Sequence, residues 1–285
     1  MAKTIGNPLS WTAHSMRDTG SHMGASIRKL GSEGKTDVPQ VNRLELSDLS
    51  DALRLGFEDF AAARADVIFI ALIYPLAGLI MITLGVSMDL LPLIVPMITG
   101  FAILGPVAAV GLYEISRLRE AGDNPDWLDA FGVIRSPAFG SIFVLGVYLA
   151  ALFIAWLMTA QAIYAQTMGP EPPLSVTGFI TDIFTTNAGW SMITIGSVVG
   201  GIFALAALAT SFVSFPLLLD RQVGLPVAVV TSFRVLKTSP MVTICWGLIV
   251  GGLLMLGSIP ILLGLIVILP VLGHATWHLY RRAVV

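Results

Sequence analysis

The sequence contains few charged residues and a single cysteine. Lys, Arg, Asp and Glu make up 12% of its 285 residues, whereas hydrophobic residues make up 55%, and the mean hydropathy is +0.84. A soluble domain contains roughly 25% charged residues. This composition therefore excludes an ordinary soluble domain and predicts an outer surface that faces lipid. The one cysteine, Cys245, excludes a disulfide framework and a thiolate metal cluster.

Basic residues are absent from every second gap between the apolar stretches. No Lys or Arg occurs around Asp89, from 166 to 189, or from 257 to 260. All 16 lie in the N-terminal part, in the alternate gaps or at the C-terminus. Because short cytoplasmic loops retain positive charge, the N-terminus, two loops and the C-terminus are predicted to be cytoplasmic. The net charge of −2 gives no support for nucleic-acid binding.

Catalytic sequence motifs are absent as well. The chain has no P-loop, no His-Glu-x-x-His metal motif, no nucleophile elbow and no Rossmann glycine fingerprint. We therefore predict that the protein is not an enzyme.

The uncharged stretches are long enough to cross a membrane, since about 20 apolar residues span the hydrocarbon core. They predict an all-α, polytopic membrane domain over residues 42–285, with six spans that pair as three hairpins. Residues 1–41, rich in Gly, Ser, Lys and His, are predicted to form a disordered cytoplasmic tail. The predicted spans cover about residues 67–86, 90–113, 138–166, 190–219, 239–257 and 260–280.

A short amphipathic segment precedes each predicted hairpin. Apolar residues recur in each segment at the same +4, +3 spacing, which places them on one face of a helix. Segments of this kind suit the cytoplasmic membrane interface, and the first is the most acidic, so it is the one we would test for a partner. The recurring residues are Leu53, Phe57 and Phe60, then Trp127, Phe131 and Ile134, then Val229, Phe233 and Leu236.

The second span of each hairpin also follows a shared pattern. Each carries a proline in its cytoplasmic half and leaves the membrane through an acid or a histidine with an arginine nearby. We interpret the chain as three copies of an amphipathic helix followed by a hairpin, arranged around a pseudo-threefold axis. The prolines are Pro106, Pro216 and Pro270, and the polar residues at the span ends are Glu114, Asp220 and His278.

Two histidines on the last predicted span are the candidates for ligand binding. His274 and His278 lie four residues apart, so both rings share one helix face, where neutral nitrogens could bind a transition metal or haem iron. Glu114 and Asp220 are candidate further metal ligands, if the repeat brings their span ends together. The alternative is that these residues anchor the span at the interface or hydrogen-bond to another helix. No cofactor is predicted, and haem or copper binding is kept as an alternative.

Small residues at four-residue spacing mark two spans for close packing. Gly196 and Gly200 in one span, and Gly247 and Gly251 in the next, let helices approach closely. The contact could lie within the chain or between subunits.

Four segments resemble one family: 104–114 (LGPVAAVGLYE), 135–137 (RSP), 215–226 (FPLLLDRQVGLP) and 272–282 (LGHATWHLYRR). They are similar to a prokaryotic family of predicted integral membrane proteins of unknown function, some members of which carry a cytochrome c oxidase label. The resemblance covers about residues 42–285. Six spans and two histidines near a span end do not suit an oxidase catalytic subunit, so the resemblance implies an accessory or assembly role and a bacterial inner-membrane location.

These observations predict a non-enzymatic membrane protein that acts as accessory subunit, scaffold or assembly factor of a larger complex, such as a respiratory one. Its predicted partners are the lipid bilayer and one or more membrane proteins. The alternatives are a small-solute or lipid transporter, with its pathway at the proline-containing halves of the spans, and a haem- or copper-binding membrane protein that uses His274 and His278.

Overall fold

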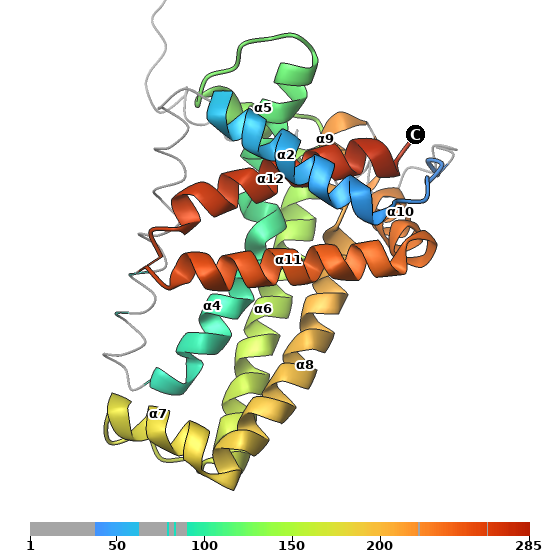
Figure 1. The fold of residues 1–285 in the computed structure, drawn as a ribbon. Helices are drawn as coiled ribbons and strands as arrows, with labels where there is room; N and C mark the ends of the chain where they lie inside the picture. Colours follow the sequence, from blue (N-terminus) through green and yellow to red (C-terminus); the bar gives the residue numbers. More distant parts are fainter. Residues whose placement is uncertain (1–37, 63–78, 80–82, 84–89, 222, 261) are drawn as a thin grey trace, which may run out of the picture.

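The computed structural model describes residues 38–62, 79, 83, 90–221, 223–260 and 262–285 (Figure 1). Nearly all of the first predicted span, 67–86, and of the predicted tail lies outside these residues, so neither is tested.

The described part of the chain folds into helices and contains no strand, only an isolated bridge between Val41 and Val284. The helices are α2 (Leu46–Ala62), η1 (Leu91–Leu93), α4 (Ile94–Ala108), α5 (Val110–Glu120), η2 (Asp129–Arg135), α6 (Phe139–Thr167), α7 (Val176–Thr185), α8 (Asn187–Ser211), α9 (Ser214–Asp220), α10 (Leu225–Thr238), α11 (Pro240–Ser258) and α12 (Leu265–Ala283). This confirms the all-α class.

Four helical stretches are long and apolar enough to cross a membrane. They are Leu91–Ala108, Phe139–Thr167, Asn187–Asp220 and Pro240–Ser258, and each matches one predicted span. The sixth predicted span, 260–280, corresponds to α12, which is not among the four. Six spans are therefore not confirmed over the described residues, although α11 and α12 do run side by side with a turn between them (Figure 1).

The helix α12 is buried between two other helices. On one side Gly56 of α2 lies against it: a Cβ at Gly56 would be 2.6 Å from the Val271 carbonyl oxygen and 2.7 Å from the Ala275 nitrogen. On the other side Gly273 lies against Leu112 of α5, where a Cβ would be 2.6 Å from a Leu112 methyl carbon. These glycines let the three helices cross at close to backbone contact.

The end of the chain is also joined to the residues that precede α2. Asn42 donates its backbone N–H to the Ala283 carbonyl (2.9 Å), and Val285 donates to the Gln40 carbonyl (3.0 Å). Arg282 forms ion pairs with Asp48 and Asp51 on α2, the second at 3.0 Å. Helix α2 is thus fastened to α12 near its beginning.

The three amphipathic segments appear as α2, η2 and α10, but η2 is a 3₁₀ helix. Each packs on a different helix: α2 on α12, η2 on α5, and α10 on α8 and α9. Figure 1 shows α2 lying along α12, while α6 and α8 run side by side below them.

Helix α7 lies at the far end of the α6–α8 pair (Figure 1), in the segment that the sequence analysis left without structure. Its first turn is capped by Ser175, whose side chain accepts a hydrogen bond from the Gly178 N–H at 3.1 Å. Ile180 and Phe184 on α7 are exposed, as are Leu174 and Trp190 beside it.

Candidate functional site

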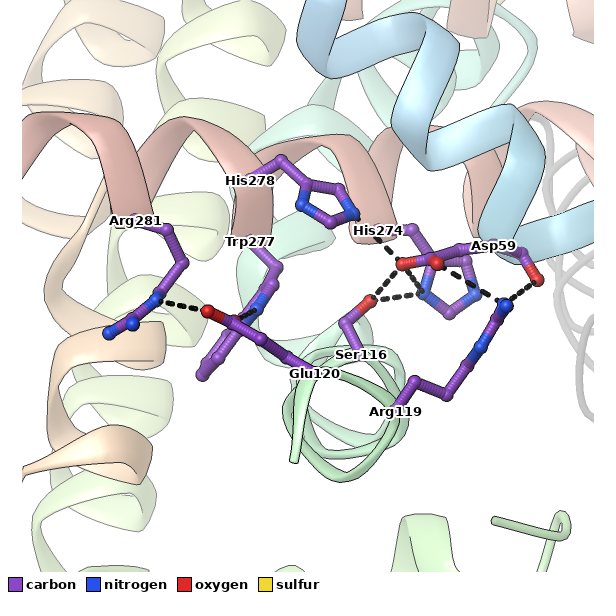
Figure 2. A network of polar contacts seen from close by, with 8 residues as sticks. All are labelled: Asp59, Ser116, Arg119, Glu120, His274, Trp277, His278 and Arg281. Carbon is purple, nitrogen blue, oxygen red and sulfur yellow. Dashed lines mark hydrogen bonds and ion pairs between the residues drawn. The ribbon is translucent and has the colours of Figure 1, made fainter. Parts of the chain in front are cut away.

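A cluster of polar side chains joins α2, α5 and α12 (Figure 2). Residues spaced three or four apart place these groups on one face of α5 and one face of α12. We call this cluster the polar network. It consists of Asp59 from α2, Ser116, Arg119 and Glu120 from α5, and His274, Trp277, His278 and Arg281 from α12.

Asp59 is the centre of the polar network. Its Oδ2 lies 2.9 Å from His278 Nε2 and accepts a hydrogen bond from Ser116 Oγ at 2.8 Å. Arg119 Nη1 lies 3.1 Å from Asp59 Oδ1 and also donates to the Asp59 backbone carbonyl at 2.8 Å. One carboxylate on α2 therefore binds groups from both α5 and α12.

His274 lies beneath Asp59 and is fully buried, with 0% of its side chain exposed. Its Nδ1 is 2.7 Å from Ser116 Oγ and 4.0 Å from Asp59 Oδ2. The ring also interacts with the backbone of Leu112 on α5. Ser116 thus bridges the carboxylate and the imidazole.

The other half of the polar network is centred on Glu120. Its carboxylate accepts hydrogen bonds from Trp277 Nε1 and from Arg281 Nε, both at 3.0 Å. Arg281 Nη1 also reaches Asp220 of α9 at 3.3 Å, and Tyr280 donates its hydroxyl to the same carboxylate at 2.6 Å. These contacts extend the network from α5 and α12 to α9.

Charge and hydrogen bonding hold Asp59 in its ionised form. Burial raises the pKa of Asp59, but the hydrogen bonds from His278 and Ser116, together with the charge interactions with His274 and His278, lower it by more, so the pKa lies below the ordinary value of 3.8. At neutral pH the site therefore contains a carboxylate.

The structure brings together some of the predicted site residues and separates others. His274 and His278 do share one face of α12. Glu114 does not join them, because it forms a two-pronged ion pair with Arg117 at 2.6 and 2.8 Å. Asp59 takes the position beside the histidines that we had assigned to Glu114. Among the described residues no group of three or more His, Cys, Asp and Glu could hold a metal ion.

The four predicted packing glycines divide into two pairs. A Cβ at Gly200 would lie 2.9 Å from the Trp156 ring, and one at Gly247 would lie 2.9 Å from a Leu208 methyl carbon, so both allow close packing within the chain. A Cβ at Gly196 or at Gly251 would meet nothing within 4 Å on other helices among the described residues.

The aromatic residues of the amphipathic segments remain largely at the surface. Phe57, Phe131 and Phe233 expose 55%, 49% and 45% of their area. Phe57 contacts Phe60, and Trp127 contacts Phe131, within their own segments.

The polar network contains Ser, His and Asp, but its geometry is that of a helix junction. In a hydrolytic triad the serine oxygen faces the substrate and donates its proton to histidine. Here Ser116 is 2% exposed and hydrogen-bonds to both Asp59 and His274 between packed helices. The groups fasten α2, α5 and α12 to one another.

Comparison with known proteins supports the family resemblance over the middle of the chain. No curated protein matches the chain, and no solved structure matches it either. Residues 94–220 match the model of a family described as a predicted integral membrane protein (DUF2189), which confirms the resemblance to a family of membrane proteins of unknown function.

Proposed function

We propose that the protein is a non-enzymatic scaffold or accessory subunit of a larger membrane complex, such as a respiratory one. The observation that carries this proposal is the use of the candidate polar residues inside the chain. His278 of α12 binds Asp59 of α2, and Ser116 of α5 binds His274 of α12, whereas Glu114 pairs with Arg117 inside α5 itself. Groups committed to holding helices together suit a protein whose function depends on its shape and surface.

We further propose the pseudo-threefold arrangement of six spans in a bacterial inner membrane, with both termini in the cytoplasm. The order of helix contacts supports it: each amphipathic segment packs on the second span of the preceding repeat, with α2 on α12, η2 on α5, and α10 on α8 and α9. In two of these contacts, α2 with α12 and η2 with α5, small residues meet at the same positions of the repeat. Gly56 meets Ala275, and Ala130 meets Gly111 with 3.1 Å between the Cβ positions.

The exposed phenylalanines suggest where this scaffold meets its surroundings. Phe57, Phe131 and Phe233 occupy the same position in the three amphipathic segments, and each is about half exposed. A shared apolar position suits insertion into the membrane interface. Helix α2 differs from η2 and α10 because it is the longest and carries the most acidic residues, whereas η2 has only Asp129 and α10 has none. We assign partner binding to α2 for that reason.

Co-purification tests the scaffold proposal. We expect the full chain, extracted from native membranes in mild detergent, to carry at least one other membrane protein in fixed proportion. A chain that runs alone, with no stoichiometric partner after gentle extraction, would contradict the proposal.

Photo-cross-linking at the three equivalent phenylalanines tests the assignment to α2. Benzoylphenylalanine in place of Phe57 should form a protein adduct, whereas the same probe in place of Phe131 or Phe233 should form mainly lipid adducts. The two latter positions are matched controls, because their side chains are exposed to a similar extent. Lipid adducts alone at all three positions would restrict these helices to membrane anchoring.

Haem or copper binding stays the alternative for His274 and His278, and small-solute or lipid transport stays the alternative for the proline-containing spans. Metal or haem would bind Nδ1 of His278, whose Nε2 contacts Asp59, or Nε2 of His274, whose Nδ1 contacts Ser116. We expect the purified protein to lack a Soret band and bound copper. A signal that disappears in His278→Ala would favour the alternative.

A further inference from the structure

A cavity of about 250 Å³ lies between five helices, away from the polar network. Helices α4, α5, α8, α11 and α12 supply its walls. Small residues on facing helices create the space, among them Gly105 and Ala108 on α4 and Gly201 and Ala204 on α8. A Cβ at Gly105 or at Gly201 would meet nothing within 4 Å, so both positions border open space. Cavities of about 150 Å³ already bind benzene-sized apolar molecules.

The walls of the cavity are almost entirely apolar. Its inner part is formed by buried residues, including Leu112, Phe212 and Trp246. Three hydroxyl side chains lie in the wall. Ser211 donates to the Ala207 carbonyl at 2.6 Å, Thr276 donates to the Leu272 carbonyl at 2.8 Å, and Tyr113 also interacts within the chain. Such a wall suits a hydrocarbon ligand, because a polar ligand would lose its hydrogen bonds to water without replacement.

The rim of the cavity carries exposed apolar side chains. Leu205 on α8 and Ile244 and Leu248 on α11 line it, and all three are exposed large apolar side chains. Both helices belong to stretches long and apolar enough to cross a membrane. The opening between them therefore leads from the bilayer hydrocarbon to the buried floor at Leu112 and Phe212.

We propose that this cavity binds one acyl chain of a membrane phospholipid. The chain lies between α8 and α11 with its end against Trp246 and Leu112, and the headgroup stays outside the cavity. The bound chain fills the space left by the small residues and stabilises the packing of α4, α8 and α11. This site goes beyond the scaffold function and does not depend on it.

Trp246 provides the measurement, because it is 2% exposed and lines the cavity. Full-length protein is reconstituted into phosphatidylcholine with brominated acyl chains and, in parallel, into the unbrominated lipid. The emission of Trp246 is obtained as the difference between the chain and its Trp246→Phe variant. We expect about twofold lower Trp246 emission in the brominated lipid, since bromine quenches an indole that it contacts.

Two substitutions on α8 make the test specific. Gly201→Leu projects a side chain into the cavity mouth and should restore Trp246 emission to the level seen in unbrominated lipid. Gly196→Leu is the matched control on the same helix: its Cβ also meets nothing within 4 Å, but Gly196 does not line the cavity. It should leave the quenching unchanged. Ala204→Phe, also at the cavity wall, serves as a second blocking variant if Gly201→Leu does not fold.

Quenching that is lost in a blocking variant and kept in Gly196→Leu supports the site. Equal quenching in blocking and control variants, or no quenching of Trp246 in the unsubstituted chain, overturns it. The failure of this test would leave co-purification and cross-linking unaffected, because neither involves the cavity.

Discussion

Replacing Gly56 with alanine should destabilise the protein, although alanine is the better helix former. Glycine in a helix interior costs roughly 0.5–1 kcal/mol relative to alanine, so propensity alone predicts a gain. Here the new methyl group would lie 2.6 Å from the Val271 carbonyl oxygen and 2.7 Å from the Ala275 nitrogen. Both are backbone atoms that cannot rotate away. We expect the clash to prevail and to lower the free energy of unfolding by about 1–3 kcal/mol, the usual cost of overpacking.

Hydrogen exchange measures this effect where it arises. Helix α2 should separate from α12 in the variant, so the amides of α2 should exchange faster than in the unsubstituted chain, together with a lower thermal midpoint in detergent. Gly252→Ala makes the same chemical change in α11, where nothing lies within 4 Å of the added methyl group. It should keep or raise the midpoint. A Gly56→Ala variant as stable as Gly252→Ala would contradict the close crossing of α2 and α12.

Much of the helical architecture can be predicted from the sequence because it depends on local pattern. Uncharged length alone identifies four spans close to their observed bounds, including Phe139–Thr167 and Pro240–Ser258. The +4, +3 spacing identifies the amphipathic segments that appear as α2, η2 and α10. The helix breaks after Ala108 and Ser211 lie near Pro106 and Pro216, the prolines that the sequence analysis singled out.

Features that depend on long-range contacts could not be predicted in this way. Uncharged length marks 260–280 as a span, yet α12 is largely covered by α2 and α5, and nothing in its own composition indicates that burial. Helix α7 was missed because Pro and Gly precede it and only ten residues form it, although Ser175 three residues before Gly178 is a usable N-cap signal.

The dependence on long-range contacts also explains why the candidate site could be predicted only in part. His274 and His278 could be paired from their spacing on one helix, but their carboxylate partner could not. Asp59 is 219 residues from His278 in the sequence, and two acids at span ends, Glu114 and Asp220, fitted the repeat pattern better. The acidic residues of α2 indicated that this helix binds a polar or basic group. Its nearest polar partners are in α5 and α12 of the same chain.

Removing the Asp59 carboxylate should therefore have a large effect on stability. In Asp59→Ala, the side chains of Ser116, Arg119 and His278 lose a shared partner in a partly buried site. Breaking a buried ion pair by removing one member costs about 3–5 kcal/mol. Because the Asp59 side chain is 14% exposed, we expect a somewhat smaller loss of about 2–3 kcal/mol in the free energy of unfolding.

The neighbouring acid gives a matched control. Glu58 pairs with Arg54 at 2.8 Å, but the Glu58 side chain is 56% exposed, so Glu58→Ala should cost at most about 0.5 kcal/mol. Equal losses in the two variants would contradict the central role of Asp59. Thermal unfolding in detergent and hydrogen exchange of α2 measure both.

Acidification should reproduce the loss of the Asp59 carboxylate. The pKa of Asp59 in the folded protein lies below its ordinary value of 3.8, so its ionised form contributes stability that is complete above that value. The contribution is lost as the pH falls from 3.8 through the lowered pKa, because the unfolded chain binds the proton first. Asp59→Asn keeps the shape of the side chain but cannot titrate. A stability profile of the unsubstituted chain should therefore fall more steeply below pH 3.8 than that of Asp59→Asn, and parallel profiles would show that the carboxylate does not couple α2 to α5 and α12.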